Sequence, residues 1–217
     1  MKLTLPPRIS PVQFDAALKA YAGVVGQQWV MASDADRDAY SDVYAPGSSE
    51  EWPASAAVAP ANVAEIQAVV RLANEHKTPL WPVSRGKNLG YGANAPRMPG
   101  SIVLDLGRMQ KVHEINTELG YCVIEPGVSF FDLYEAIQRE KAPLWMSVPG
   151  NAWGSVLGNA LDHGMGYAPY GQHAKNLCGM EVVLPDGDLM RTGMGAMEDN
   201  HSFHLFPLSF GPDWTQM

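Results

Sequence analysis

One segment of the chain combines glycine with cationic and amide side chains at a spacing suited to anion binding. Residues 82–92 read Pro-Val-Ser-Arg-Gly-Lys-Asn-Leu-Gly-Tyr-Gly and follow a short apolar run at 79–81. Glycine lets backbone N–H groups approach an anion closely, and Arg85 and Lys87 add positive charge. The composition predicts a cradle for a diphosphate, with Tyr91 facing the reactive part of a bound cofactor. A glycine-rich surface turn explains the composition equally well.

A second glycine-rich region lies in the second half of the chain. It spans residues 149–159 and continues over 164–171. Ser155 is placed near the start of a short helix over 154–162, whose N-terminus would offer partial positive charge to a phosphate. The pair Gly164-x-Gly166 lacks a preceding strand and a later acidic residue, so a Rossmann fingerprint is a weak interpretation.

Helix caps and hydrophobic periodicity predict the elements that position these segments. Ser10 caps a helix that runs to Val25 and ends at Gly26. Asn62-Val-Ala-Glu65 resembles a capping box for a helix to His76. Ser129 caps a further helix that reaches about Arg139. We also expect a short helix near 34–40 and strands at 56–59, 79–83, 102–106, 112–115, 121–125, 144–148, 180–184 and 189–192.

The strand at 56–59, the helix from 62 and the strand at 79–83 predict a βαβ unit. Such a unit delivers the first glycine-rich segment at the carboxyl end of a strand, where ligands bind in α/β sheets. The whole pattern predicts two small α+β lobes, 1–100 and 101–217, each with one glycine-rich loop. A dinucleotide between the lobes would then be contacted from both sides. Residues 193–217 show no clear periodicity.

Composition restricts the classes of partner. The chain has 217 residues, is 46% apolar and carries a net charge of −8 without a basic stripe, which argues against nucleic acid and anionic membranes. No apolar run reaches the roughly 18 residues of a membrane span. No signal peptide is evident, so we expect a cytoplasmic protein. Cys122 and Cys178 lie in apolar surroundings and are expected to be reduced thiols.

Several motifs, in this order and spacing, resemble the vanillyl-alcohol oxidase and para-cresol methylhydroxylase flavoproteins. Each motif is weak alone, whereas the set is specific and covers residues 5–212. The motifs are Ser84-Arg-Gly-Lys-Asn-Leu-Gly-Tyr-Gly92, Glu125-Pro-Gly-Val128, Gly154-Ser-Val-Leu-Gly-Asn159, Gly164-Met-Gly-Tyr-Ala-Pro-Tyr-Gly171, Gly179-Met-Glu-Val-Val-Leu184 and Arg191-Thr-Gly-Met-Gly195.

The resemblance implies an α+β fold in which two subdomains hold FAD. It implies that Tyr91 binds the phenolic oxygen of the substrate and that Tyr167 lies near flavin and substrate, so both are candidate catalytic residues. The pyrophosphate is wrapped by Ser84, Arg85, Gly86, Lys87, Asn88, Leu89 and Gly90. The other cofactor-binding candidates are Pro149, Gly150, Gly154, Ser155, Gly158, Asn159, Gly164 and Tyr167.

The activity implied by the resemblance is oxidation of 4-alkylphenols or para-hydroxybenzylic alcohols. A hydride passes to the flavin, and water adds to the resulting quinone methide. Phenols ionise near pH 10, so the site has to favour the phenolate. Oxidase members carry an aspartate beside the flavin, whereas residues 147–151 read Ser-Val-Pro-Gly-Asn. This difference favours a dehydrogenase-like member with a cytochrome c subunit as electron acceptor, which would permit a periplasmic location. A homo-oligomer is expected for the full-length form.

Other interpretations of the same residues stay open. The family is more than twice as long as this chain, so we expect the substrate domain and any covalent flavin attachment beyond Met217. A flavoenzyme of the same fold could act on an alcohol or hydroxy acid, although a carboxylate substrate would favour arginines over Tyr91. A non-catalytic FAD-binding fragment is the other alternative. Without the resemblance, both tyrosines would be read as packed core rings. No metal is expected, because His163 and His173 lack further ligands.

Overall fold

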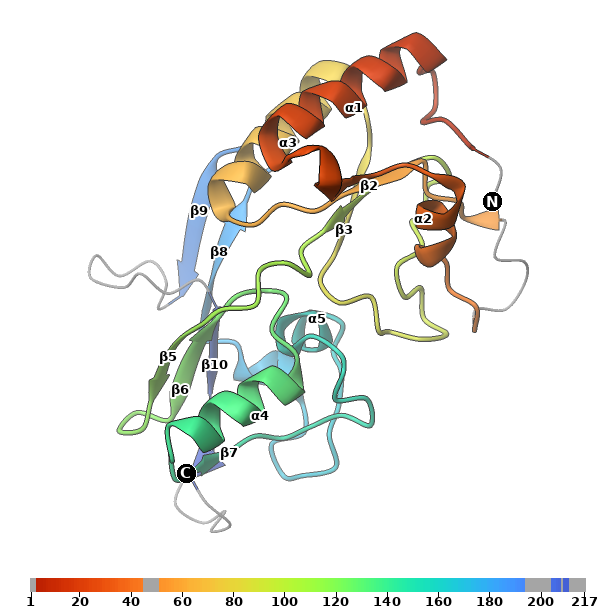
Figure 1. Ribbon diagram of the computed structural model, residues 1–217. Helices are drawn as coiled ribbons and strands as arrows, with labels where there is room; N and C mark the ends of the chain where they lie inside the picture. The colour runs from red at the N-terminus through yellow and green to blue at the C-terminus, as the bar shows by residue number, and fades with distance from the viewer. Residues whose placement is uncertain (1–2, 45–50, 194–203, 208, 211–217) are drawn as a thin grey trace. The chain divides into compact units, whose positions relative to one another are not determined.

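The structure is a computed structural model that describes residues 3–44, 51–193, 204–207 and 209–210. The chain divides into two compact units, which are described separately below (Figure 1). Unit 1 comprises residues 1–108 and 183–188, and unit 2 comprises residues 109–182 and 189–217. The end of the last predicted motif, at Gly195, lies outside the described residues.

Unit 1 is built on a four-stranded sheet with the order β1-β2-β4-β3. Its strands are β1 (Val30–Met31), β2 (Ala56–Val58), β3 (Leu80–Val83) and β4 (Ile102–Asp105). Strands β2, β4 and β3 are parallel, and β1 pairs with β2 in the antiparallel sense. The inner strands β2 and β4 read as apolar runs that are almost entirely buried, as expected for strands covered on both faces.

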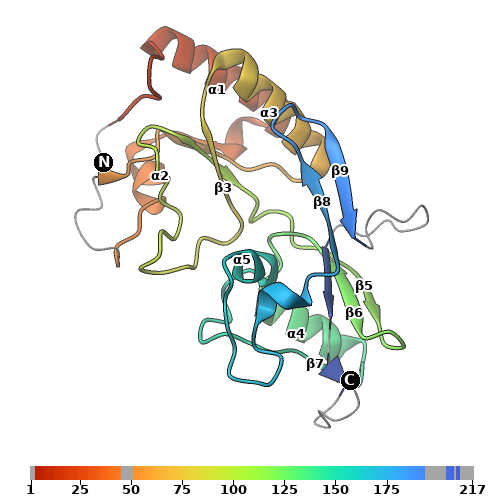
Figure 2. The ribbon, with the colours of Figure 1, turned by 180° about the vertical axis from the view of Figure 1, so that it is seen from behind.

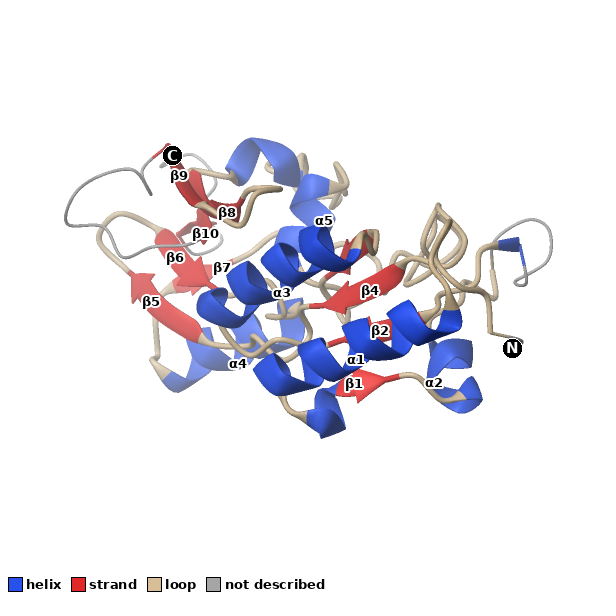
Figure 3. Ribbon diagram, turned by 90° about the horizontal axis from the view of Figure 1, so that it is seen from above, coloured by secondary structure: helices blue, strands red, loops and turns tan. Residues whose placement is uncertain are grey.

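Two helices, α1 (Pro11–Val25) and α3 (Val63–His76), lie side by side over one face of this sheet (Figure 3). The predicted caps are present: Ser10 forms a capping box with Gln13, and the Asn62 side chain accepts the Glu65 N–H. The Glu65 carboxylate binds the Ala61 N–H, one residue before the Asn62 cap, so this bond differs from that of the predicted capping box. A short helix, α2 (Asp34–Ala39), contacts β2. The predicted helices of this unit are therefore confirmed.

The predicted βαβ unit is confirmed, with one addition that the sequence did not indicate. Strand β4 lies between β2 and β3, so α3 crosses over one intervening strand. This order makes β3 an edge strand. The glycine-rich segment therefore leaves the sheet at an edge, directly after Val83.

Unit 2 contains a five-stranded sheet with the order β5-β6-β10-β8-β9. The strands are β5 (Val112–Asn116), β6 (Tyr121–Ile124), β8 (Gly179–Val183), β9 (Leu189–Gly193) and β10 (His204–Pro207). The strands β8 and β9 were predicted, at 180–184 and 189–192. Strand β10 was not, because four residues are too few to show an alternating pattern.

Helix α4 (Phe130–Arg139) packs against β5 and β7 in unit 2 (Figure 2). Its buried face joins an apolar core that includes Ile124, Leu133 and Val156. Strand β7 is limited to Leu144–Trp145 and pairs with β11 (Ser209–Phe210), so the strand predicted over 144–148 is too long. Beyond it, the chain turns to bring Ser147 to a buried histidine. Within the described residues, no helix is long and apolar enough to cross a membrane.

Candidate functional site

The first glycine-rich segment follows β3 and folds back on itself over residues 88–93. The Asn88 carbonyl accepts the N–H groups of Tyr91 and Ala93, both at 3.0 Å. Gly86 has φ +57°, a left-handed conformation that favours glycine. A Cβ atom at Gly86 would also lie 1.2 Å from the Asn94 Oδ1 atom. Glycine is therefore favoured at position 86, where another residue would be strained and would displace the Asn94 side chain.

A buried carboxylate, Asp42, binds the end of this loop. Its Oδ1 atom accepts the N–H of Gly90 at 3.1 Å and that of Tyr44 at 3.1 Å, and its Oδ2 atom accepts the N–H of Gly92 at 2.8 Å. Burial by itself would raise the pKa of Asp42. The N–H groups of Gly92, Gly90 and Tyr44, together with the charge of Arg97, outweigh that effect and hold the pKa below its usual value.

Sequence reasoning missed Asp42. The residue lies in an irregular polar segment, about 50 positions before the loop it binds, and no local pattern connects the two. The consequence for the predicted site is specific. The Gly90 N–H already has a protein partner, so Gly90 contributes conformation to the loop while its N–H is directed at Asp42.

The remaining part of the loop has the chemistry that a diphosphate requires. Residues 84–86 are half-buried, and residues 87–89 are exposed. The segment carries two cations, Arg85 and Lys87, and no carboxylate. Residues 84–89 therefore fit a doubly charged anion held by cations and polar donors.

The second glycine-rich region is organised around Ser155. Its hydroxyl accepts the Gly158 N–H at 2.9 Å, which caps helix α5 (Val156–Leu161), and donates to the Pro126 carbonyl at 2.6 Å. The bond to Pro126 therefore joins two motifs that are separate in the sequence, Glu125-Pro-Gly-Val128 and Gly154-Ser-Val-Leu-Gly-Asn159. Because the Ser155 hydroxyl is buried and has two partners, its first role is to position this loop. A helix of six residues has only a small macrodipole for a phosphate.

A buried histidine fixes the other predicted residues of this region. His173 is fully buried, its Nδ1 atom contacts the Asn159 Oδ1 atom, and its Nε2 atom lies 2.9 Å from the Ser147 hydroxyl. Burial lowers the pKa of His173, so the ring is neutral near neutral pH. Because the Asn159 Oδ1 atom can only accept, Nδ1 carries the proton and Nε2 accepts from the Ser147 hydroxyl. Sequence reasoning considered His173 only as a metal ligand and missed this role.

Two glycines of the second region are required by this packing. A Cβ atom at Gly164 would lie 2.0 Å from the Asn159 Nδ2 atom, and one at Gly166 would lie 2.3 Å from the Ser147 Oγ atom. Gly154 is also restricted, since a Cβ atom there would be 3.2 Å from the Asn151 carbonyl oxygen. The glycine spacing of this motif is thus explained by the protein's own contacts.

Gly150 differs from these glycines. It follows Pro149 on the surface, and a Cβ atom added to it would meet nothing within 4 Å. Nothing in the packing of unit 2 requires glycine there. A glycine at this position is compatible with close approach of a ligand to the backbone.

Both predicted catalytic tyrosines are on the surface. Tyr91 is 83% exposed in unit 1, and Tyr167 is fully exposed in unit 2. Reading them as packed core rings is therefore wrong, and each hydroxyl is accessible to a ligand.

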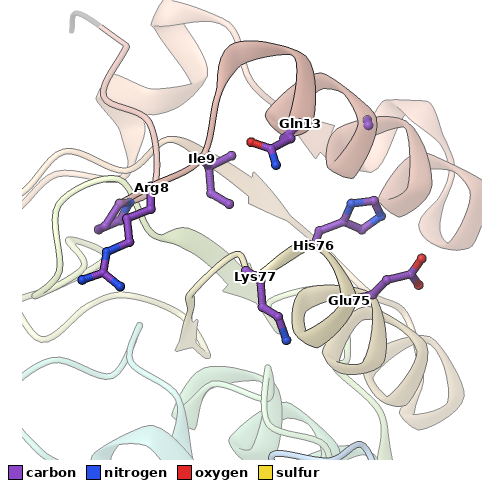
Figure 4. Close-up of a pocket in the computed structure, with 8 residues that line it drawn as sticks. Arg8, Ile9, Gln13, Glu75, His76 and Lys77 are labelled. Atoms are coloured by element: carbon purple, nitrogen blue, oxygen red, sulfur yellow. The ribbon is translucent and has the colours of Figure 1, made fainter.

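Unit 1 also has a surface hollow of about 550 Å³ that none of the predicted residues line (Figure 4). It lies between the segment before α1 and the C-terminal end of α3, and its lining includes Arg8, His76 and Lys77. Helix α3 ends at His76, shortly before β3 begins at Leu80, whereas the glycine-rich loop follows the last residue of β3, Val83. The hollow and the loop therefore lie at opposite ends of β3.

Comparison with known proteins assigns the fold to a family. The family described as FAD binding domain matches residues 54–193. The chain is 37% identical over 209 residues to the 4-cresol dehydrogenase [hydroxylating] flavoprotein subunit of Pseudomonas putida, covering 96% of this chain and 40% of the relative. The chain belongs to the FAD binding domain family. The resemblance to the para-cresol methylhydroxylase type of flavoprotein, the α+β fold and FAD as the cofactor are thereby confirmed.

Two further proteins are similar to nearly the whole of this chain. It is 36% identical to 1'-carboxy-chondrochloren decarboxylase of Chondromyces crocatus, covering 91% of this chain and 36% of the relative. The solved structure of 4-ethylphenol oxidase from Gulosibacter chungangensis in complex with isoeugenol superposes with a TM-score of 0.91 at 35% identity. That match covers 95% of this chain and 45% of the oxidase chain. The chain thus spans less than half the length of these relatives.

Proposed function

We propose that this domain holds FAD for the oxidation of 4-alkylphenols or para-hydroxybenzylic alcohols. The observation that carries the proposal is the similarity of nearly the whole chain to two proteins named for 4-cresol and 4-ethylphenol. The exposed Tyr91 at the end of the glycine-rich loop is consistent with it. A phenolic oxygen is the kind of group that a tyrosine hydroxyl recognises by hydrogen bonding.

In this proposal, residues 84–89 bind the diphosphate of FAD. Arg85 and Lys87 neutralise its charge, and Ser84 and Asn88 supply further hydrogen-bond donors. In unit 2, residues 149–159 and Gly164 provide the second set of contacts. Gly150 lets the chain approach the cofactor closely, while Ser155 and Asn159 keep this region in shape.

The chemistry that FAD supplies when bound is acceptance of the hydride that leaves the benzylic carbon. The protein has to favour the phenolate, since loss of the phenol proton drives charge into the ring and assists hydride departure. Tyr91 donates a hydrogen bond to the phenolic oxygen, and one such donor is worth about 2–4 kcal/mol in a transition state. Tyr167 lies near the flavin and the substrate in this proposal.

A cytochrome c subunit is the electron acceptor that we propose. Residues 147–151 contain no carboxylate, which is the dehydrogenase-like pattern, and the P. putida relative is itself named a flavoprotein subunit. An acceptor of this kind would be compatible with a periplasmic location. We also propose that a substrate domain and homo-oligomer contacts belong to a full-length form, since this chain covers 40% of the P. putida relative.

The decarboxylase similarity supports a second candidate, in which the same FAD-binding domain serves a carboxylate-bearing substrate. The two candidates predict that different substrates reduce the bound flavin. We therefore suggest loading the purified chain with FAD and following the flavin absorbance anaerobically after adding 4-cresol, vanillyl alcohol or glycolate. Bleaching by the phenols alone is the expected result, at a slow rate because the chain spans only part of its relatives.

The other outcomes of this experiment are equally informative. Bleaching by glycolate would contradict the phenolic substrate class. Binding of FAD without bleaching by any reductant would support the alternative of a non-catalytic FAD-binding fragment. Failure to bind FAD would contradict the proposal as a whole.

A further inference from the structure

The carboxylate of Asp42 lies inside the turn formed by residues 88–92. Its two oxygens accept the N–H groups of Gly90 and Gly92 at 3.1 Å and 2.8 Å. The N–H between them, that of Tyr91, donates to the Asn88 carbonyl at 3.0 Å. Three consecutive N–H groups of this turn therefore have partners within the protein. An internal carboxylate occupies a position that a bound anion takes in comparable glycine-rich turns.

Asp42 has no helix to cap. Helix α2 ends at Ala39, three residues earlier, and the only other group that Asp42 is seen to bind among the described residues is the nearby Tyr44 N–H. Its segment also approaches the loop at a second point, where the Asn94 side chain donates to the Ala39 carbonyl at 3.3 Å. Residues 39–44 thus support the loop that carries the candidate site.

Neighbouring groups compensate the negative charge of the Asp42 carboxylate. Three backbone N–H groups surround its oxygens, and Arg97 is the charged group that acts on it from the loop side. A compensated carboxylate can remain ionised beside a loop that binds a diphosphate. Asp42 binds the loop at Gly90 and Gly92, so Tyr91 is held between two fixed glycines, and residues 84–89 precede the part of the loop that Asp42 binds.

We propose that Asp42 is a positioning residue that fixes the 88–92 turn and thereby sets the direction of Tyr91 and the boundary of the phosphate-binding segment. This inference rests on the proposed function for the roles of Tyr91 and residues 84–89. The contact between Asp42 and the turn does not depend on that function. Its test can therefore be separated from the test of FAD or phenol binding.

The direct test uses the amide protons of Gly90 and Gly92 in the ¹⁵N-labelled chain. In the wild type, both protons should titrate together as the pH is lowered from about 7 to about 2, because both donate to one carboxylate whose pKa lies below the usual Asp value of about 3.9. The Asp42→Asn variant should lose this shared titration. Asparagine has one acceptor oxygen, and its NH₂ group would face the second N–H donor. Asp15→Asn, which removes an exposed carboxylate of α1, is the charge-matched control and should retain it.

The effect on the site is measured as the Kd for FAD. Loss of a hydrogen bond to a charged group should raise this Kd roughly tenfold in Asp42→Asn and leave it unchanged in Asp15→Asn. If wild-type Gly90 and Gly92 do not titrate together, or if Asp42→Asn leaves their titration intact, the inference is overturned. The wild-type titration decides this even if the variant fails to fold. If the amides behave as expected but the wild type binds no FAD, the proposed function fails and the contact stands.

Discussion

At the scale of single residues, the two glycine-rich regions use glycine for different reasons. Gly86 needs its positive φ and lies against Asn94, so its role is conformational. Gly166 lies against Ser147 and His173, so its role is to leave space. Gly150 has neither constraint within unit 2. The three positions therefore predict different responses to the same substitution.

Substituting Gly86 and Gly150 by alanine separates folding from ligand contact. Gly86→Ala should lower the free energy of unfolding by roughly 1–3 kcal/mol, the cost of a side chain in a left-handed conformation. Gly150→Ala should leave stability within about 0.5 kcal/mol of the wild type and weaken FAD binding. Denaturant unfolding and FAD titration of both variants check this. Equal stability losses in the two variants would refute the distinction.

The buried His173 predicts a dependence of stability on pH. Burial lowers its pKa in the folded state. Above the unfolded value of about 6.5, the ring is neutral in both states and has no effect. Below that value the unfolded chain takes up a proton that the folded chain resists, so the free energy of unfolding falls until the pH passes the folded pKa.

Thermal melting between about pH 7.5 and about pH 5 tests this dependence around the reference value. His173→Asn should reduce the fall in Tm across that range. His163→Asn is the matched control, because His163 is exposed and its φ of +55° suits asparagine. An unchanged slope in His173→Asn would show that another group is responsible.

At the scale of elements, side-chain caps determine where the helices of both units begin. Ser10 and Ser129 form capping boxes, and both residues were predicted as helix caps from local sequence alone. Ser155 is different, because its hydroxyl also donates to the Pro126 carbonyl, 29 positions away. A cap with a second, long-range partner joins a helix to another loop.

Comparison of two serine caps tests this difference. Ser155→Ala removes a buried hydroxyl with two partners and should lower the free energy of unfolding by about 2–3 kcal/mol. Ser10→Ala removes an exposed cap and should lower it by about 0.5–1 kcal/mol. Chemical denaturation of the two variants measures both values. A smaller loss for Ser155→Ala would contradict a structural role for that hydroxyl.

The elements that could be predicted are those whose signals are local. Helices α1, α3 and α4 carry their caps and apolar faces within a few residues. Strand β10 could not be predicted, because its position between β6 and β8 depends on pairing with distant segments. The 144–148 strand was predicted too long, since the contact of Ser147 with His173 spans 26 positions.

At the scale of the whole molecule, the sequence motifs were sufficient for the family and its cofactor. They placed the glycine-rich segments and the exposed tyrosines on loops, as the structure has them. They could not identify Asp42 or His173, whose partners in the glycine-rich regions lie 14 to 50 positions away. Such residues act by shaping loops, and their contacts become visible only when the chain is folded.

The claim that most of this account depends on is that the domain recognises FAD through its ADP portion, which contains the diphosphate. Equilibrium dialysis of the purified chain against FAD and against riboflavin, which lacks the ADP portion, tests it most directly. We predict one FAD bound per chain, with an affinity at least about tenfold above that for riboflavin. Equal affinity for the two flavins, or no binding of FAD, would contradict the account.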